Sequence, residues 1–179
     1  MSSLKDLMSL LPPPPEAIES EDAVAWGRVE RSLGTELPLD YKELLATYGS
    51  GAVDGFLWIL NPFSKNRYLN LIDEGLVKLE ALAALINETV PYPLYPVPNG
   101  LLPCAVTDNG DVIFWICSGH PSEWNLAINE GRGPRWREYK LSLTDFLIQL
   151  ISRKLIVDIF PHDFPSDEPV FCQYKVASR

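Results

Sequence analysis

The residues best able to carry chemistry in this chain are its two histidines, and neither has the neighbours that catalysis requires. His120 lies in the loop sequence Ser118-Gly-His-Pro121, and His162 lies between a proline and an aspartate. Their separation excludes the HxxxH and HExxH pairs of a helix-borne metal site, and Ser118 lacks the flanking glycines of a nucleophile elbow. We therefore expect both histidines to be surface residues and predict no catalytic residues and no enzyme activity.

A pair of aspartates, Asp108 and Asp111, flanks the dipeptide Asn109-Gly110. A calcium loop would need DxDxDG spacing and a closing glutamate, which this segment lacks. The simpler interpretation is that both aspartates are turn residues. A hydrolase that uses Asp108 or Asp111 with His120 is therefore the function with the least support.

The cysteines and glycines also lack the spacing of a metal or cofactor site. An odd set of three cysteines without a CxxC pair argues against a disulfide framework and a zinc site, and favours small buried side chains in a reducing compartment: Cys104, Cys117 and Cys172. Gly49 and Gly51 follow a predicted helix, and no Lys-Ser or Lys-Thr pair comes after them, so a phosphate-binding loop is not indicated. We expect no metal and no cofactor.

The charge of the chain argues against nucleic acid and anionic membranes as partners. Its 15 Lys and Arg against 24 Asp and Glu give 15 − 24 = −9, and phosphate binding needs a basic surface. A short basic and aromatic cluster at residues 132–140 is interrupted by Glu138 and is better interpreted as a solvated hairpin. The apolar runs are far shorter than the roughly 20 residues of a membrane span, and the N-terminus lacks the layout of a signal peptide. We expect a cytoplasmic protein.

The hydrophobic pattern predicts one α+β domain with about four helices packed against a mainly antiparallel mixed sheet. Helices are expected between residues 23 and 33, from a capping box formed by Asp40 and Glu43 to Tyr48, within residues 69–88, and after Ser142. Leu4 to Leu11 allows one or two helical turns, but the four prolines that follow stop them. Residues 1–15 are therefore predicted to be an arm or linker, and residues 16–179 the domain.

Strands are expected at residues 56–60, 101–107, 112–117, 124–129 and 136–141, with a possible edge strand at 170–176. The dipeptide Asn109-Gly110 predicts a two-residue hairpin turn in the middle of the sheet, which would place Thr107 opposite Val112 and Cys104 opposite Trp115. Trp26, Trp58 and Trp115 fall on predicted core faces. Trp124 and Trp136 begin strands beside polar loops, where each is either a lid on the core or a binding anchor.

The residue types and their spacing between Trp26 and Gly51 resemble the N-terminal signature of the SUKH superfamily, which includes the fungal Smi/Knr regulators of cell-wall assembly. The resemblance extends over about residues 20–155, with Asp108-Asn-Gly-Asp111 and Phe114-Trp115 as the central hairpin. The resemblance implies a protein without enzyme activity. Bacterial members of the superfamily neutralise co-encoded toxins, often nucleases, and fungal members act as regulators. The matching residues have structural roles: Trp26, Glu30, Gly34, Pro38, Tyr41, Gly49, Gly51, Asn109, Gly110 and Trp115.

The leading hypothesis is an immunity-type protein that blocks a basic, possibly nuclease, toxin domain by acidic surface complementarity. The alternative is a regulatory or scaffolding module of the cell-wall-regulator type, which docks partners through the proline-rich arm and the tyrosine-rich connector at residues 91–103. Exposed acids beside aromatic residues, at the hairpin and at the strand entries, are the predicted partner-binding residues: Asp108, Asp111, Glu123, Trp124 and Trp136.

Overall fold

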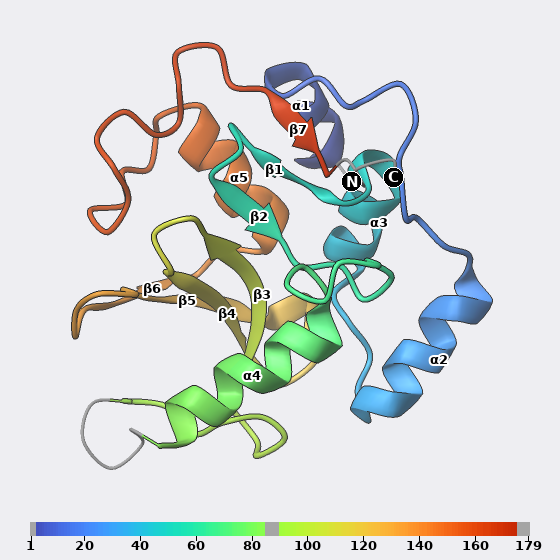
Figure 1. Cartoon of the computed structure of the whole chain (residues 1–179), viewed down its shortest axis with the longest axis vertical. Helices are drawn as coiled ribbons and strands as arrows, with labels where there is room; N and C mark the ends of the chain where they lie inside the picture. The colour runs from blue at the N-terminus through green and yellow to red at the C-terminus, as the bar shows by residue number, and fades with distance from the viewer. Residues whose placement is uncertain (1–2, 85–89, 175–179) are drawn as a thin grey trace.

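A computed structural model describes residues 3–84 and 90–174 of the chain (Figure 1). In these residues it has five α-helices, a short 3-10 helix η1 (Pro121–Glu123) and one seven-stranded sheet. The helices are α1 (Ser3–Leu10), α2 (Ala23–Leu33), α3 (Leu39–Tyr48), α4 (Leu71–Ala83) and α5 (Leu143–Ile151). The strands are β1 (Gly51–Val53), β2 (Leu57–Ile59), β3 (Leu101–Thr107), β4 (Val112–Ile116), β5 (Asn125–Asn129), β6 (Trp136–Tyr139) and β7 (Phe171–Gln173).

The strand order is β6-β5-β4-β3-β2-β1-β7, and every neighbouring pair is antiparallel. The predicted α+β class with a mainly antiparallel sheet is confirmed, as are the central position of the β3–β4 hairpin and the edge position of the last strand. The sequence pattern missed the short strand β1. The predicted helical residues 85–88 and strand residues 175–176 lie outside the described residues.

Apolar side chains cover both faces of the sheet. The larger cluster joins one face to α1, α3 and α5, and the tyrosine and tryptophan rings at its centre pack edge to face. The hydroxyl of Tyr41 donates to the carbonyl of Leu60 at 2.5 Å, so this buried polar atom has a partner. A smaller cluster on the other face contains Leu82 of α4 and Phe114 of β4. The predicted core positions of Trp26 and Trp115 are confirmed.

Leu4, Leu7 and Leu11 belong to this core, so residues 3–11 do not form part of the expected arm. Leu7 and Leu11 are fully buried, and α1 packs against α5. The hydroxyl of Tyr48 donates to the carbonyl of Leu11 at 2.6 Å. The prolines end the helix as predicted, but the apolar face before them is buried because Leu7 and Leu11 are one helical turn apart.

The register predicted for the central hairpin is wrong. Val106 lies opposite Val112 and Leu102 opposite Trp115, with an irregularity between Pro103 and Ala105. A two-residue type I′ turn needs positive φ at both central residues, but in this turn only Gly110 has it, at 87°. The amide of Gly110 donates to the carbonyl of Thr107, so the loop has three residues and the pairing shifts accordingly.

Two further expectations are corrected. Asp40 does not cap its own helix, because α3 begins at Leu39 after Pro38 and has no side-chain cap. Its carboxylate instead accepts the amide of Thr144 at 3.0 Å, at the start of α5, which Ser142 caps as predicted. Trp58 is half-buried outside the two core clusters.

The signature residues hold the connection between α2 and α3. Glu30 accepts the amide of Leu37 at 3.0 Å and the ammonium of Lys42 at 2.7 Å, while Gly34 caps α2 in the left-handed conformation. Gly49 ends α3 at φ 68°, and a Cβ there would come within 2.2 Å of the carbonyl oxygen of Ile18. These positions are therefore required by the fold, independently of any partner.

Candidate functional site

Three hairpin turns open at the same end of the sheet, because neighbouring strands are antiparallel and β1–β2, β3–β4 and β5–β6 are each joined directly. These turns comprise residues 54–56, 108–111 and 130–135. The β4–β5 connection, which contains η1, lies at the opposite end. The five predicted partner-binding residues therefore do not form one surface: Asp108, Asp111 and Trp136 lie at the turn end, and Glu123 and Trp124 lie at the other.

Asp111 and Trp124 are buried, which contradicts the exposure on which their assignment as binding residues rested. Asp111 is 3 % exposed, and its carboxylate accepts the hydroxyl of Thr107 at 2.7 Å and the amide of Gly131 at 2.9 Å. Trp124 is 5 % exposed and its ring lies 5.9 Å from that of Trp115. Asp111 thus joins two turns, and Trp124 is a lid on the core.

The other three residues are accessible to different extents. Asp108 is exposed and accepts the indole N–H of Trp58 at 2.8 Å. Glu123 is exposed at η1, where it accepts the amide of the surface residue His120. Trp136 is half-buried, with its ring centre 5.6 Å from that of Tyr92. A binding role for Asp108, Glu123 and Trp136 stays a prediction.

A segment that the sequence pattern did not single out completes the turn end: residues 155–170, here named the C-terminal loop. It is held by Asp54, whose carboxylate accepts the amides of Ser166 and Val170, both at 2.9 Å. Two of its rings pack on Phe56, with Phe160 at 5.8 Å and Phe164 at 4.6 Å between ring centres. The β1–β2 turn therefore fixes the loop by polar and apolar contacts together.

Ion pairs tie the same loop to β6. Asp158 accepts the guanidinium of Arg137 at 2.5 Å and lies 3.5 Å from that of Arg135, which also pairs with Glu130 at 2.5 Å. The hydrogen bond from Arg137 lowers the pKa of Asp158, and that from Arg135 lowers the pKa of Glu130. Two cations of the predicted basic cluster are thus already paired with carboxylates of the chain.

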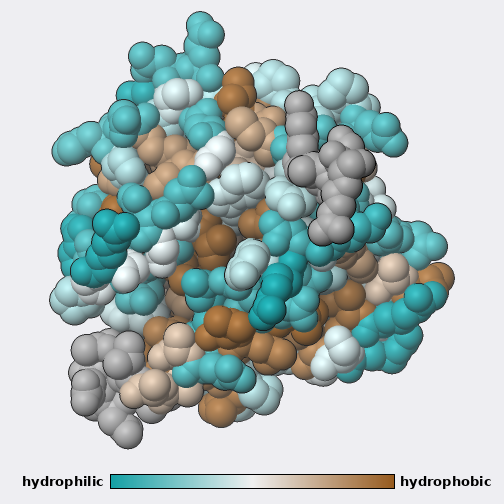
Figure 2. All heavy atoms as spheres, in the orientation of Figure 1, coloured by the Kyte–Doolittle hydropathy of each residue, from teal (hydrophilic) through white to brown (hydrophobic). Residues whose placement is uncertain are grey.

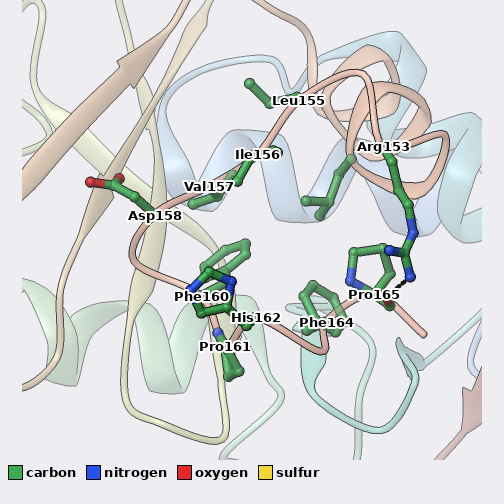
Figure 3. Close-up of a pocket in the computed structure, with 11 residues that line it drawn as sticks. Arg153, Leu155, Ile156, Val157, Asp158, Phe160, Pro161, His162, Phe164 and Pro165 are labelled. Atoms are coloured by element: carbon green, nitrogen blue, oxygen red, sulfur yellow. Dashed lines mark hydrogen bonds between the residues drawn. The ribbon is translucent and has the colours of Figure 1, made fainter. Parts of the chain in front are cut away.

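An apolar pocket of about 300 Å³ lies between the end of α5 and the C-terminal loop (Figure 3). Its lining includes Leu150, Phe160 and Phe164. Arg153 reaches from the end of α5 to the carbonyl of Pro165 at 3.0 Å and to Asp167 at 2.7 Å, whereas the carboxylate of Asp158 points away from the pocket. The contacts of Arg153 fix the C-terminal loop to the end of α5 beside the pocket.

The rim of this pocket is apolar, and the C-terminal loop that forms most of it carries acidic residues. Ile156 on the rim is 82 % exposed, the highest value among the large hydrophobic residues that the structure describes. The charged residues of the C-terminal loop are all exposed and all acidic, with no Lys or Arg among them: Asp158, Asp163, Asp167 and Glu168. Such a surface favours a partner with an apolar side chain among basic residues. The absence of Lys and Arg over residues 155–170 was the sequence signal for this rim.

The described residues offer little for other chemistry. They contain no group of three His, Cys, Asp or Glu side chains that could hold a metal ion. Burial raises the pKa of the Cys104 thiol well above its usual value and that of Cys117 to about 12, which disfavours a thiolate nucleophile. Over residues 3–84 and 90–174, none of the helices has the length and apolar character that crossing a bilayer requires.

Comparison with protein families gives a match to the family model SUKH_6, described as SMI1-KNR4 cell-wall, over residues 25–147. Comparisons with curated proteins and with solved structures gave no significant match. The matched range covers the signature between α2 and β1 and the central hairpin, while α1 and the C-terminal loop lie outside it. Because the match extends over well more than half of the chain, the protein belongs to the SMI1-KNR4 cell-wall family of the SUKH superfamily.

Proposed function

We propose that this chain is a cytoplasmic, non-enzymatic immunity protein that neutralises a toxin domain by binding it at the turn end of the sheet. Family membership supports an immunity or regulatory interaction domain. The observation that carries the proposal is the apolar pocket between the end of α5 and the acidic C-terminal loop, which lies outside the family match. Binding surfaces that select individual partners are expected on loops held by a rigid scaffold.

The proposed partner is basic. Asp163 and Glu168 make no ion pair with any described residue, and Asp108 lies at the same end of the sheet. A positively charged surface, such as that of a nuclease, would approach these carboxylates faster and dock an apolar side chain beside Ile156. Because the pocket is already formed, little conformational entropy is lost on binding.

The test uses the full chain and the products of the genes that flank its own. Each product is expressed with and without the chain, its toxicity is measured, and binding is measured by pull-down. We expect one product to be toxic, to bind and to be neutralised. Failure of every flanking product to bind or to be neutralised would refute toxin neutralisation.

Matched variants test where the partner binds. Ile156→Ser should weaken binding by at least about tenfold, whereas Leu39→Ser should not, because Leu39 is also strongly exposed, at 64 %, but begins α3. Reversing the charges of Asp163 and Glu168 to Lys should slow association and reduce its salt dependence. The same reversal at the exposed residues Glu36 and Glu43 is the control. If charge reversal at Glu36 and Glu43 slows association as much as charge reversal at Asp163 and Glu168, the turn end of the sheet is not the binding surface.

The alternative, a regulatory module that docks partners through the proline-rich segment, has a different signature. Leu11, directly before the prolines, is buried in the core, so this segment is not a detached docking arm. A partner that binds through Pro12–Pro15 would be lost when these prolines are replaced but would be insensitive to Ile156→Ser.

A further inference from the structure

A second apolar groove, of about 330 Å³, lies between α2 and α4, away from the turn end. Its walls are formed by Leu33 of α2 and by Ile72, Leu76 and Leu79 of α4. Figure 2 shows apolar side chains gathered on this face of the molecule, over α4 and beside α2. Leu76 is 57 % exposed, so the apolar surface of α4 continues out of the groove onto the surface of the protein.

Gly75, within α4, forms part of the lining, and its own helix gives no reason for a glycine there. Its φ is not positive, and a Cβ added to it would meet no atom within 4 Å. Glycine in the middle of a helix is less favourable than alanine, so this position loses stability without relieving any internal contact. The missing side chain leaves space in the groove that nothing in the described chain uses.

The charges beside the groove indicate what fills this space. Asp73 and Glu80 lie three residues before and four residues after Leu76, so they are its neighbours on the surface of α4. Both are exposed, and neither makes an ion pair with any described residue. On α2, Arg28 and Arg31 are exposed and Glu30 pairs with Lys42, so the exposed acidic residues beside the groove belong to α4.

We propose that this groove binds an amphipathic helix of a partner protein, with an apolar side chain above Gly75 and Lys or Arg residues facing Asp73 and Glu80. A second copy of the chain is disfavoured, because it would bring the same carboxylates and a net charge of −9 to the contact. A small-molecule site would need several convergent polar groups. The phenol of Tyr95, at the groove, already donates to the carbonyl of Leu33.

The proposal can be tested without the natural partner. The probes are two fluorescent helical peptides of about four turns, with the same leucine face and with either Lys or Glu beside it. Each is titrated into the full-length protein, and binding is followed by anisotropy. The Lys peptide should bind saturably, and the Glu peptide should bind at least about tenfold more weakly. Glu80→Lys should weaken binding of the Lys peptide.

Gly75→Leu fills the groove and should weaken binding of the Lys peptide at least about tenfold. Its melting temperature should not fall below that of the wild type, because the new side chain enters empty space. The matched control is Gly27→Ala in α2, where a Cβ would meet only the end of the Arg31 side chain at 3.4 Å, and which should bind normally.

Three results would overturn the proposal: equal binding to Gly75→Leu and wild type, equal binding of the two peptides, or no saturable binding below about 1 mM. A wild-type dimer in sedimentation that Gly75→Leu converts to a monomer would also overturn it, in favour of a second copy. The groove does not depend on toxin neutralisation. Loss of function in Ile156→Ser with normal peptide binding, or the reverse, separates the two proposals.

Discussion

Asp111 and Asp108 are alike in the sequence but have opposite positions in the structure, so replacing each with alanine is a direct test of the reasoning. Both flank the same turn, and both were expected to be exposed. Asp111 is buried and joins the β3–β4 turn to the β5–β6 loop, whereas Asp108 is exposed. We expect Asp111→Ala to destabilise the fold and Asp108→Ala to change its stability little.

The magnitude follows from the hydrogen bonds that each carboxylate accepts. Asp111→Ala removes the bonds from the Thr107 hydroxyl at 2.7 Å and from the Gly131 amide at 2.9 Å. A hydrogen bond to a charged group is worth about 1.5 to 3 kcal/mol, and the bond to the exposed Gly131 belongs at the low end, giving about 3 kcal/mol in total. Asp108→Ala removes one exposed bond, from Trp58, and should cost about 1 kcal/mol or less.

The free energy of unfolding of both variants is measured with urea. For a chain of this size, about 3 kcal/mol corresponds to a decrease of about 6 to 12 °C in melting temperature and of about 1 to 2 M in the urea midpoint. Asp111→Asn should lose less than Asp111→Ala, because the amide oxygen can still accept a hydrogen bond. A double-mutant cycle with Thr107→Val should give a coupling of at least about 0.5 kcal/mol.

Equal stability of Asp111→Ala and Asp108→Ala would refute the assigned roles. So would a large destabilisation by Asp111→Ala without coupling to Thr107, because the loss would then come from elsewhere. If Asp111→Ala weakens partner binding without lowering the melting temperature, Asp111 is a binding residue and does not stabilise the fold by joining the two turns.

Three other predictions test the core and its ionisable groups. Tyr48→Phe leaves the carbonyl of Leu11 unpaired and should lower the free energy of unfolding, measured with urea, by about 1 to 3 kcal/mol. Burial raises the pKa of Tyr48 to about 12. The wild type should therefore lose stability as the pH rises from about 10 to about 12, and Tyr48→Phe should lose less over the same range. Burial raises the pKa of Cys104 and Cys117, so iodoacetamide at pH 8 should modify them slowly in the native protein and rapidly in urea, as followed by mass spectrometry. The hydrogen bond from Arg137 lowers the pKa of Asp158, so the ion pairs of Asp158 stabilise the fold above the unfolded-state pKa and are lost as the pH falls through the lower folded-state pKa. The stability difference between wild type and Asp158→Asn should be present at pH 6 and should shrink progressively below the ordinary aspartate pKa of about 3.9.

Local patterns predicted most of the helices and strands because their signals are local. Ser142 caps α5, Gly34 ends α2, and the apolar residues around Trp58 form β2. The failures concern choices that distant residues decide. Asp40 has capping-box spacing with Glu43, but Thr144, on another helix, takes its carboxylate. Patterns along the chain cannot resolve this competition, because the amides of its own helix and the amide of Thr144 are chemically equivalent donors.

The candidate site was predicted less well than the fold, for a related reason. The predicted binding residues are acids and aromatic residues that lie close together within single turns. Trp124 is among them because the packing of its ring against Trp115 leaves no signal in the neighbouring sequence. The sequence pattern predicts no helix or strand for the C-terminal loop before residue 170. Its position depends on Asp54, more than 100 residues earlier, which accepts the amides of Ser166 and Val170. Contacts of such sequence separation leave no periodic signal.

The net charge of −9 indicated the sign of a partner but not its place, because many of the acids are already used within the fold. Carboxylates that accept internal hydrogen bonds cap helices, hold loops or join turns, namely those of Asp22, Glu30, Asp40, Asp54 and Asp111. Such groups contribute to the long-range field but cannot exchange their partners at a binding surface without loss of stability. The charges that can do so are exposed and make no ion pair with a described residue, as is the case for Asp163 and Glu168. Exposed carboxylates that make no ion pair within the described fold are therefore a better guide to a binding surface than the charge of the whole chain.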